Sequence, residues 1–158
     1  MEQCIHYIKT NDVPRFTESL EKLPNWTEER GNIPIQIYKT EPLSGNYLNM
    51  KCNLLQIAVA LQNLNAIKLL IHESKIKREN LERFLFEKVA VQAANLESDA
   101  KWIQGATVAH LAARFCPQVL GLLLDIQPGL VDNSENEAEF TPLHVAAAST
   151  AHKCSGVR

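Results

Sequence analysis

Features that identify many classes of protein are missing from this sequence of 158 residues. No apolar run approaches the roughly 18–20 residues that a membrane-spanning helix needs. The first residues, Met1–His6, contain neither the basic stretch nor the apolar core of a signal peptide. We therefore expect no membrane partner and no secretory route.

An excess of charge of one sign is also missing. The 16 lysines and arginines and the 18 aspartates and glutamates give a formal net charge of -2. Proteins that bind nucleic acid through bulk electrostatics usually carry a clear positive excess. We therefore expect no nucleic-acid partner.

Cysteine is scarce and scattered. Disulfide frameworks and zinc sites need cysteines in close pairs or in groups that supply four ligands. No two of the cysteines here are close in the sequence: Cys4, Cys52, Cys116 and Cys154. We expect no bound metal and a reducing compartment, the cytoplasm or the nucleus or both.

Catalytic motifs are absent as well. The sequence has no Gly-rich phosphate loop, no His-Glu-x-x-His and no Gly-x-Ser-x-Gly. We therefore predict that the chain is not an enzyme, and that it has no catalytic residue, no cofactor and no small-molecule substrate.

What the sequence does contain is a motif that recurs. Residues 141–147 read Thr-Pro-Leu-His-Val-Ala-Ala, and residues 107–113, 34 positions earlier, keep the Thr, the His and the paired alanines. Residues 53–59 keep a Leu and an Ala but have amides where Thr and His stand. Leu-rich runs follow the two earlier copies, at residues 66–71 and 119–124.

This pattern resembles the ankyrin repeat, a unit of about 33 residues whose first helix carries Thr-Pro-Leu-His, one free position and Ala. The resemblance implies an all-α solenoid of about four irregular repeats, with two enlarged connections and an incomplete last repeat. The expected repeats span about 2–23, 53–72, 107–126 and 141–150. The enlarged connections, called here the first and second insertions, span about 24–52 and 72–104.

The resemblance also assigns structural roles to the motif residues. In this family the His of the motif hydrogen-bonds locally and ties one repeat to the next, so we expect no acid–base role for either His. The motif residues are Thr107, His110, Ala112, Thr141, Pro142, Leu143, His144 and Ala146.

Residues 2–23 are interpreted as a first, capping repeat. Ile5 and Ile8 share one helical face, and Asp12 is a suitable N-cap for a second helix. Phe16 and Leu20 then recur at helical spacing, with polar residues between them, as the solvated outer face of a terminal repeat requires.

The first insertion contains several prolines and glycines, which favours loop over helix. Ile33, Ile35 and Ile37 alternate with other residues, which predicts a short strand or hairpin arm. Pro34 cannot donate a ladder hydrogen bond, so we expect it on an edge strand.

The sequence of the second insertion predicts an amphipathic helix over about Glu79–Leu96. Its apolar residues fall near helical spacing: Leu81, Phe84, Leu85, Val89, Ala93 and Leu96. A degenerate, shortened repeat is the alternative. Both insertions replace the turn between repeats, so we expect them to project from the same side of the stack.

Loops on that side are the usual recognition surface of solenoids. Trp102 is equally consistent with core packing. The acidic turn at Asp132 and Glu135 could meet a basic partner, but its composition favours an ordinary hydrophilic turn. The candidate partner-binding residues are Ile35, Ile37, Tyr38, Lys39, Trp102, Asp132 and Glu135.

Apolar periodicity stops after Ala148, and we expect residues 151–158 to be disordered. A partner would then cover the open face of the stack, or the chain is a shortened form of a longer array. The predicted function is non-catalytic protein–protein interaction, as a scaffold or regulator. The alternative is an N-terminal ankyrin portion of a larger enzyme, channel or adaptor.

Overall fold

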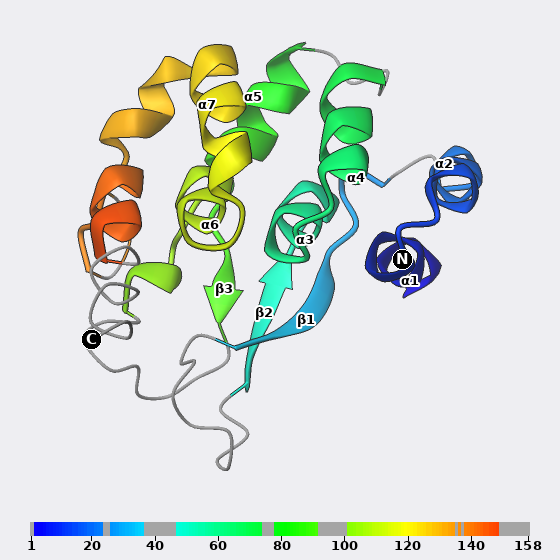
Figure 1. The fold of residues 1–158 in the computed structure, drawn as a ribbon, viewed down its shortest axis with the longest axis horizontal. Coiled ribbons are helices and arrows are strands. Elements are labelled where there is room, and N and C mark those ends of the chain that lie inside the picture. The colour runs from blue at the N-terminus through cyan, green and yellow to red at the C-terminus, as the bar shows by residue number, and fades with distance from the viewer. Residues whose placement is uncertain are drawn as a thin grey trace.

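The computed structural model describes residues 2–23, 26–36, 47–73, 78–91, 101–134, 136 and 138–148. These residues form a mostly helical fold with one small, three-stranded sheet (Figure 1). The predicted tail, residues 151–158, lies outside the described residues.

The first helix pair consists of α1 (Glu2–Thr10) and α2 (Val13–Glu21). Between them Asn11 takes the left-handed conformation, with φ of 56°, which Asn tolerates better than most residues. Asp12 then caps α2, because the backbone N–H of Arg15 donates to its Oδ1 at 3.3 Å.

The second pair repeats this local design. It consists of α3 (Leu54–Ala60) and α4 (Leu64–Lys68), which continues as the π-helix η1 (Leu69–Glu73). Gln62 has φ of 61°, and Asn63 accepts a hydrogen bond from the backbone N–H of Ala66 at 3.1 Å. The turn between helices is therefore built the same way in both pairs.

The third pair consists of α6 (Val108–Phe115) and α7 (Pro117–Ile126), followed by the 3-10 helix η3 (Pro128–Asp132). Its turn is tighter, because Pro117 can occupy the first position of α7, where a backbone N–H has no helical partner. Residues 142–148, which carry the best-formed motif, are also helical.

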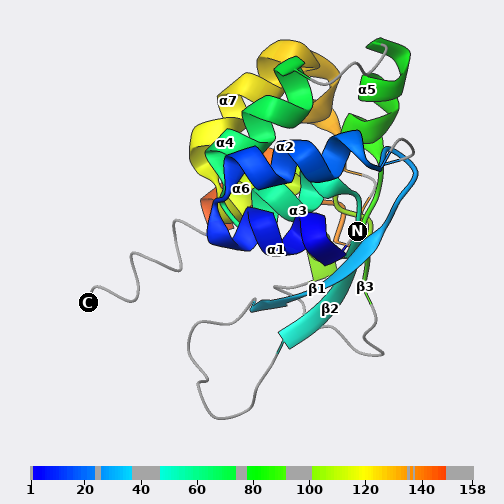
Figure 2. The same ribbon diagram turned by 90° about the vertical axis from the view of Figure 1, so that its right-hand side faces the viewer.

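The pairs follow one another across the molecule in chain order. The first helices, α1, α3 and α6, form one layer, and the second helices, α2, α4 and α7, form a layer above it (Figures 1 and 2). The motif helices are closely packed: every residue from Val108 to Ala113 is buried, and so is every residue from Leu54 to Val59. Small alanines at this layer let neighbouring backbones approach.

The sheet joins the two insertions. Strands β1 (Gly31–Gln36) and β2 (Tyr47–Cys52) come from the first insertion, and β3 (Ala90–Val91) comes from the second. The order is β1-β2-β3, and both pairings are antiparallel. The sheet lies below the helical layers (Figures 1 and 2).

The expectation of an all-α fold is therefore wrong for the insertions. Away from the helices their backbone groups need partners, and three extended segments supply them to one another. The predicted strand is confirmed over 33–36, within β1, and Pro34 lies on an edge strand as expected. Residues Ile37, Tyr38 and Lys39 lie outside the described residues.

One face of the sheet packs against the helices. Ile33 and its partner Met50 are 1% and 0% exposed, whereas Asn32, Asn49 and Lys51 on the opposite face are exposed. This alternation has the period of two that a half-buried strand requires.

The helix predicted over Glu79–Leu96 is shorter than expected. Helix α5 (Arg78–Phe86) buries Phe84 and Leu85, as the apolar pattern predicts, but it ends at Phe86. Beyond it Val89 donates to the carbonyl of Ala106 at 2.9 Å and accepts from the N–H of Gly105 at 3.1 Å, which fixes an extended backbone. Hydrogen bonds to a distant segment thus override the helical spacing.

Asn63 links the first two pairs, and its replacement should be costly. Its side chain caps α4, and its Nδ2 donates to the carbonyl of Ile8 at 2.9 Å in a buried position. Asn63→Ala should lower the free energy of unfolding by about 2–3 kcal/mol, because two buried groups lose their partners. Urea denaturation measures this.

The matched comparison is Asp12→Ala, at the equivalent cap of α2. The Asp12 side chain is partly exposed, so its loss should cost about 1 kcal/mol or less. Equal losses for the two variants would show that the bond to Ile8 contributes nothing.

Candidate functional site

A buried histidine connects the third helix pair to the following segment. The backbone N–H of Thr107 donates to Nδ1 of His110 at 3.1 Å, and the Thr107 hydroxyl lies 2.9 Å from the same nitrogen. Because a backbone N–H can only donate, Nδ1 is an acceptor and the ring proton lies on Nε2. That N–H donates to the carbonyl of Phe140 at 2.7 Å.

Asn136 holds the turn that presents this carbonyl. Its Oδ1 accepts from the backbone N–H groups of Ala138 and Phe140, which orients the amide. Its Nδ2 then donates to the carbonyl of Phe140, so the 3.1 Å contact with Nε2 of His110 joins two donors that share one acceptor.

Burial keeps His110 neutral. Desolvation lowers the pKa of His110, and this effect outweighs the backbone hydrogen bonds to Phe140 and Asn133, which raise it. The imidazole is therefore a fixed connector between a helix N-terminus and the next turn.

Gln56 makes the equivalent connection in the second helix pair. Its Oε1 accepts from the backbone N–H of Asn53 at 2.9 Å, and Asn53 Oδ1 accepts from the backbone N–H of Gln56 at 2.8 Å. Nε2 of Gln56 donates to the carbonyl of Glu87 at 2.9 Å. Gln56 reaches 31 residues along the chain, and His110 reaches 30. An amide, which also has one acceptor and one donor end, replaces the imidazole.

The side chain of Asn53 has fewer of its hydrogen-bonding groups paired than that of Thr107. Both are 0% exposed, but the Nδ2 of Asn53 has no hydrogen-bond partner among the described residues. A buried N–H without a partner is destabilising. The amide pair thus makes the connection and leaves one donor unpaired.

The motif at Thr141 has the same local bonds. The N–H of Thr141 donates to Nδ1 of His144 at 3.0 Å, and the hydroxyl of Thr141 lies 2.8 Å from it. Both histidines therefore make the local bond that the resemblance implies. His144 is exposed, and no second partner is found for it in the part of the chain that the structure describes.

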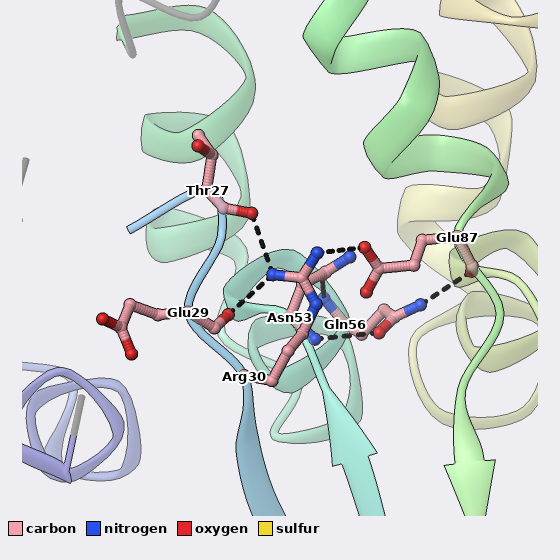
Figure 3. A network of polar contacts seen from close by, with 6 residues as sticks. All are labelled: Thr27, Glu29, Arg30, Asn53, Gln56 and Glu87. Carbon is pink, nitrogen blue, oxygen red and sulfur yellow. Dashed lines mark hydrogen bonds and ion pairs between the residues drawn. The ribbon is translucent and has the colours of Figure 1, made fainter. Parts of the chain in front are cut away.

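The two insertions meet at Arg30 and Glu87. Nη1 of Arg30 donates to the carbonyls of Thr27 and Glu29, each at 2.8 Å, and Nη2 forms an ion pair with the carboxylate of Glu87. The guanidinium of Arg30 lies 5.7 Å from the ring centre of Phe84. Figure 3 shows the side chains of Arg30, Gln56 and Glu87 converging from three segments.

The short segment from Glu87 to Val91 is a crossing point. It binds Arg30 of the first insertion through a carboxylate and Gln56 of α3 through a carbonyl. Val89 bonds to Ala106, just before α6, and Val91 pairs with β2. The sheet is therefore anchored where the second and third helix pairs are connected.

The outer face of the sheet is exposed, and its edges are poor sites for strand addition. Asn32, Lys51 and Ala90 stand in register across the three strands. On one edge Pro34 lacks an N–H, and on the other the N–H of Val91 donates to Oε1 of Gln104 at 2.8 Å.

The sequence-predicted site residues are only partly brought together. Ile35 lies in β1, and Glu135 lies outside the described residues. Trp102, in η2 (Lys101–Ile103), is 3% exposed, so it packs in the core and offers no ring to a partner. Asp132 is exposed at the end of η3, away from the sheet strands in sequence.

Sequence reasoning missed Arg30, Phe84 and Glu87 as a group, because single residues 54 and 57 positions apart carry no local pattern. Gln56 could have been recognised: it stands three residues after Asn53, as His110 stands after Thr107.

Reactive groups are scarce in the described residues. Among them no group of three or more His, Cys, Asp or Glu side chains could hold a metal ion. Cys4, Cys52 and Cys116 are buried and free, and burial raises the pKa of each thiol. No described helix is both long and apolar enough to span a bilayer.

No family model, curated protein or solved structure matches this chain.

The equivalence of Gln56 and His110 predicts which substitution His110 tolerates. His110→Gln can accept from Thr107 and donate to Phe140, so it should lower the free energy of unfolding by about 1 kcal/mol or less. His110→Ala leaves both groups buried without a partner and should cost about 2–4 kcal/mol. Urea denaturation compares the variants, and equal losses would contradict the equivalence.

His110 should also make stability depend on pH. Its pKa is lowered in the fold and is near 6.5 in the unfolded chain. Below about pH 6.5 the unfolded state therefore binds the proton first, and stability falls as pH decreases toward the folded pKa. Above pH 6.5 this contribution is fully present.

Comparing the natural chain with His110→Gln separates the pH dependence due to His110 from that of the other titrating groups. The difference in free energy of unfolding between the natural chain and His110→Gln should shift against the natural chain between pH 7 and 5. A difference that stays constant over this range would show that His110 does not titrate differently on folding.

Proposed function

We propose that this chain is an irregular ankyrin-repeat protein that binds another protein and has no catalytic activity of its own. Its repeats are those expected from the motif, at about 2–23, 53–72, 107–126 and 141–150. The two insertions are enlarged fingers, and they form the main recognition element.

The recurrence of local geometry supports the repeat assignment. Asp12 and Asn63 cap equivalent second helices after a left-handed residue. Gln56 and His110 connect equivalent first helices to a carbonyl about 30 residues later. A solenoid needs such repeated links between neighbouring units, because no single helix pair buries both of its faces.

The observation that carries the functional proposal is the sheet shared by the two insertions. Strand β3 begins at Ala90, 38 residues after β2 ends at Cys52, yet the two insertions form one sheet on one side of the helical layers. Strands held at fixed positions lose little conformational entropy when a partner binds. Such a rigid arm suits recognition better than two independent loops would.

The chemistry of the arm favours recognition by side chains. Proline and the Gln104 side chain hinder strand addition at the two sheet edges. The exposed face offers amides and one lysine, Asn32, Asn49 and Lys51, which suit a polar partner surface. The candidate contacts from the sequence are Ile35 in β1, the residues Ile37, Tyr38 and Lys39 that follow β1 in the sequence, and, separately, Asp132 and Glu135.

Shortening the arm tests the proposal. Gln36 and Tyr47 are paired across β1 and β2, so residues 37–46 can be replaced by Asn-Gly, which closes a two-residue hairpin turn. The helical circular dichroism should be unchanged, and affinity for a protein captured by the full chain should fall about tenfold or more. Binding is measured with the purified captured protein.

The matched variant is Arg15→Ala, an exposed residue of α2 distant in sequence from the insertions. It should bind like the natural chain. Unchanged affinity of the shortened arm, with helicity intact, would place the recognition site elsewhere on the stack.

A further inference from the structure

Helix α5 is too short to be stable by itself. It has nine residues, and isolated helices below about 12–15 residues are marginal in water. Among residues 81–86 of α5, Glu82 and Arg83 are exposed, Phe84 and Leu85 are buried, and Leu81 and Phe86 are half-buried against the core.

Strand β3 is equally dependent on neighbours. It contributes two residues, Ala90 and Val91, which pair with Lys51 and Met50 of β2. A two-residue strand supplies few hydrogen bonds, so its position also depends on its other contacts: the bonds of Val89 to Ala106 and Gly105, the bond of Val91 to Gln104, and the pairing of Glu87 with Arg30.

The cluster around Arg30 holds both elements. Phe84 of α5 lies against the rings of Trp26, at 5.7 Å between centres, and under the guanidinium of Arg30. Glu87, between α5 and β3, pairs with the same guanidinium. Arg30 itself donates to the carbonyls of Thr27 and Glu29. The turn before β1 therefore contacts the second insertion through the Arg30 side chain.

This contact can open. The Arg30 and Glu87 side chains are 24% and 26% exposed, so water and salt reach the pair at the rim of a small cleft. Gln56 and His110, which connect the helix pairs to later segments, are by contrast 0% exposed. An accessible ion pair is weakened by salt far more than a buried hydrogen bond is.

We propose that Arg30, Phe84 and Glu87 form a latch that makes α5, β3 and the turn at residues 26–30 open and close as one unit, while the helix pairs stay folded. The latch joins the two insertions, because Arg30 is a contact that α5 and the segment before β3 share with the turn before β1. Displacing Arg30 in the first insertion therefore also weakens the attachment of α5 and β3 in the second.

Hydrogen exchange of the full chain tests the latch. Arg30→Met keeps an unbranched side chain against Phe84 and removes every donor. Amides of residues 81–86, and those of Val89 and Val91, should exchange about tenfold faster or more, while amides of α3 and α6 should change less than about twofold. The control is Arg83→Met, which removes a cation from the same cleft.

Arg83 makes no side-chain hydrogen bond or ion pair with any described residue, so Arg83→Met should leave all of these rates unchanged. A uniform rise across α3 and α6 in Arg30→Met would overturn the latch, since the chain would then open as a whole. No change in residues 81–91 would overturn it too.

A measurement without any variant guards against a misfolded Arg30→Met. For the natural chain, raising NaCl from about 0.05 M to about 1 M should speed exchange in residues 81–91 several-fold and leave α3 and α6 protected. A salt response shared equally by all helices, or none in residues 81–91, contradicts the latch. These experiments need no binding partner, so their failure is separate from failure of the proposed function.

Discussion

The arrangement of the helix pairs depends on a buried side chain that satisfies two distant backbone groups at once. His110 accepts from the N–H of Thr107 and donates to the carbonyl of Phe140. Gln56 accepts from Asn53 and donates to Glu87. Leaving either backbone group unpaired in the core would cost about 1–3 kcal/mol. This requirement explains why an imidazole and a primary amide are interchangeable here: each presents an acceptor and a donor at opposite ends of a short, rigid group. It also fixes the spacing between pairs, since the accepting carbonyl must arrive at a defined place.

The need to pair these backbone groups also explains where the second insertion can accommodate extra residues. The chain must deliver the carbonyl of Glu87 to Gln56, and it must begin α6 at Thr107. Between these points Val89 and Ala106 are joined by a hydrogen bond, so the chain leaves and returns at the same place. The length inserted between them does not disturb the helix pairs, because its ends are already closed. The first insertion obeys the same rule, as Gly31 pairs with Cys52 directly before α3.

Much of the helical layer could be predicted from the sequence, and the insertions could not. The alanines and the His of residues 107–113 predicted a buried first helix, and Ile33 predicted a strand, because those signals are local. The end of α5 at Phe86 was not predictable: the spacing of Val89 and the later apolar residues is helical, and a bond to Ala106 overrides it. The ion pair of Arg30 with Glu87 leaves no trace in either local sequence. Trp102 could not be assigned to core or surface from composition, since aromatic residues occupy both.

Stability is therefore distributed unevenly, and the distribution follows the chemistry of each contact. The helix pairs are connected by neutral hydrogen bonds of the buried residues Asn63, Gln56 and His110, and salt weakens such bonds less than it weakens an ion pair. The sheet and α5 also bury side chains, but between them and the turn before β1 lies a partly exposed ion pair, beside the contact of Phe84 with Trp26. Elements that bind partners are generally drawn from the less stable part of a fold. The helix pairs therefore fix where the sheet begins and ends, while the accessible pair of Arg30 and Glu87 is the contact between the insertions that salt weakens most readily.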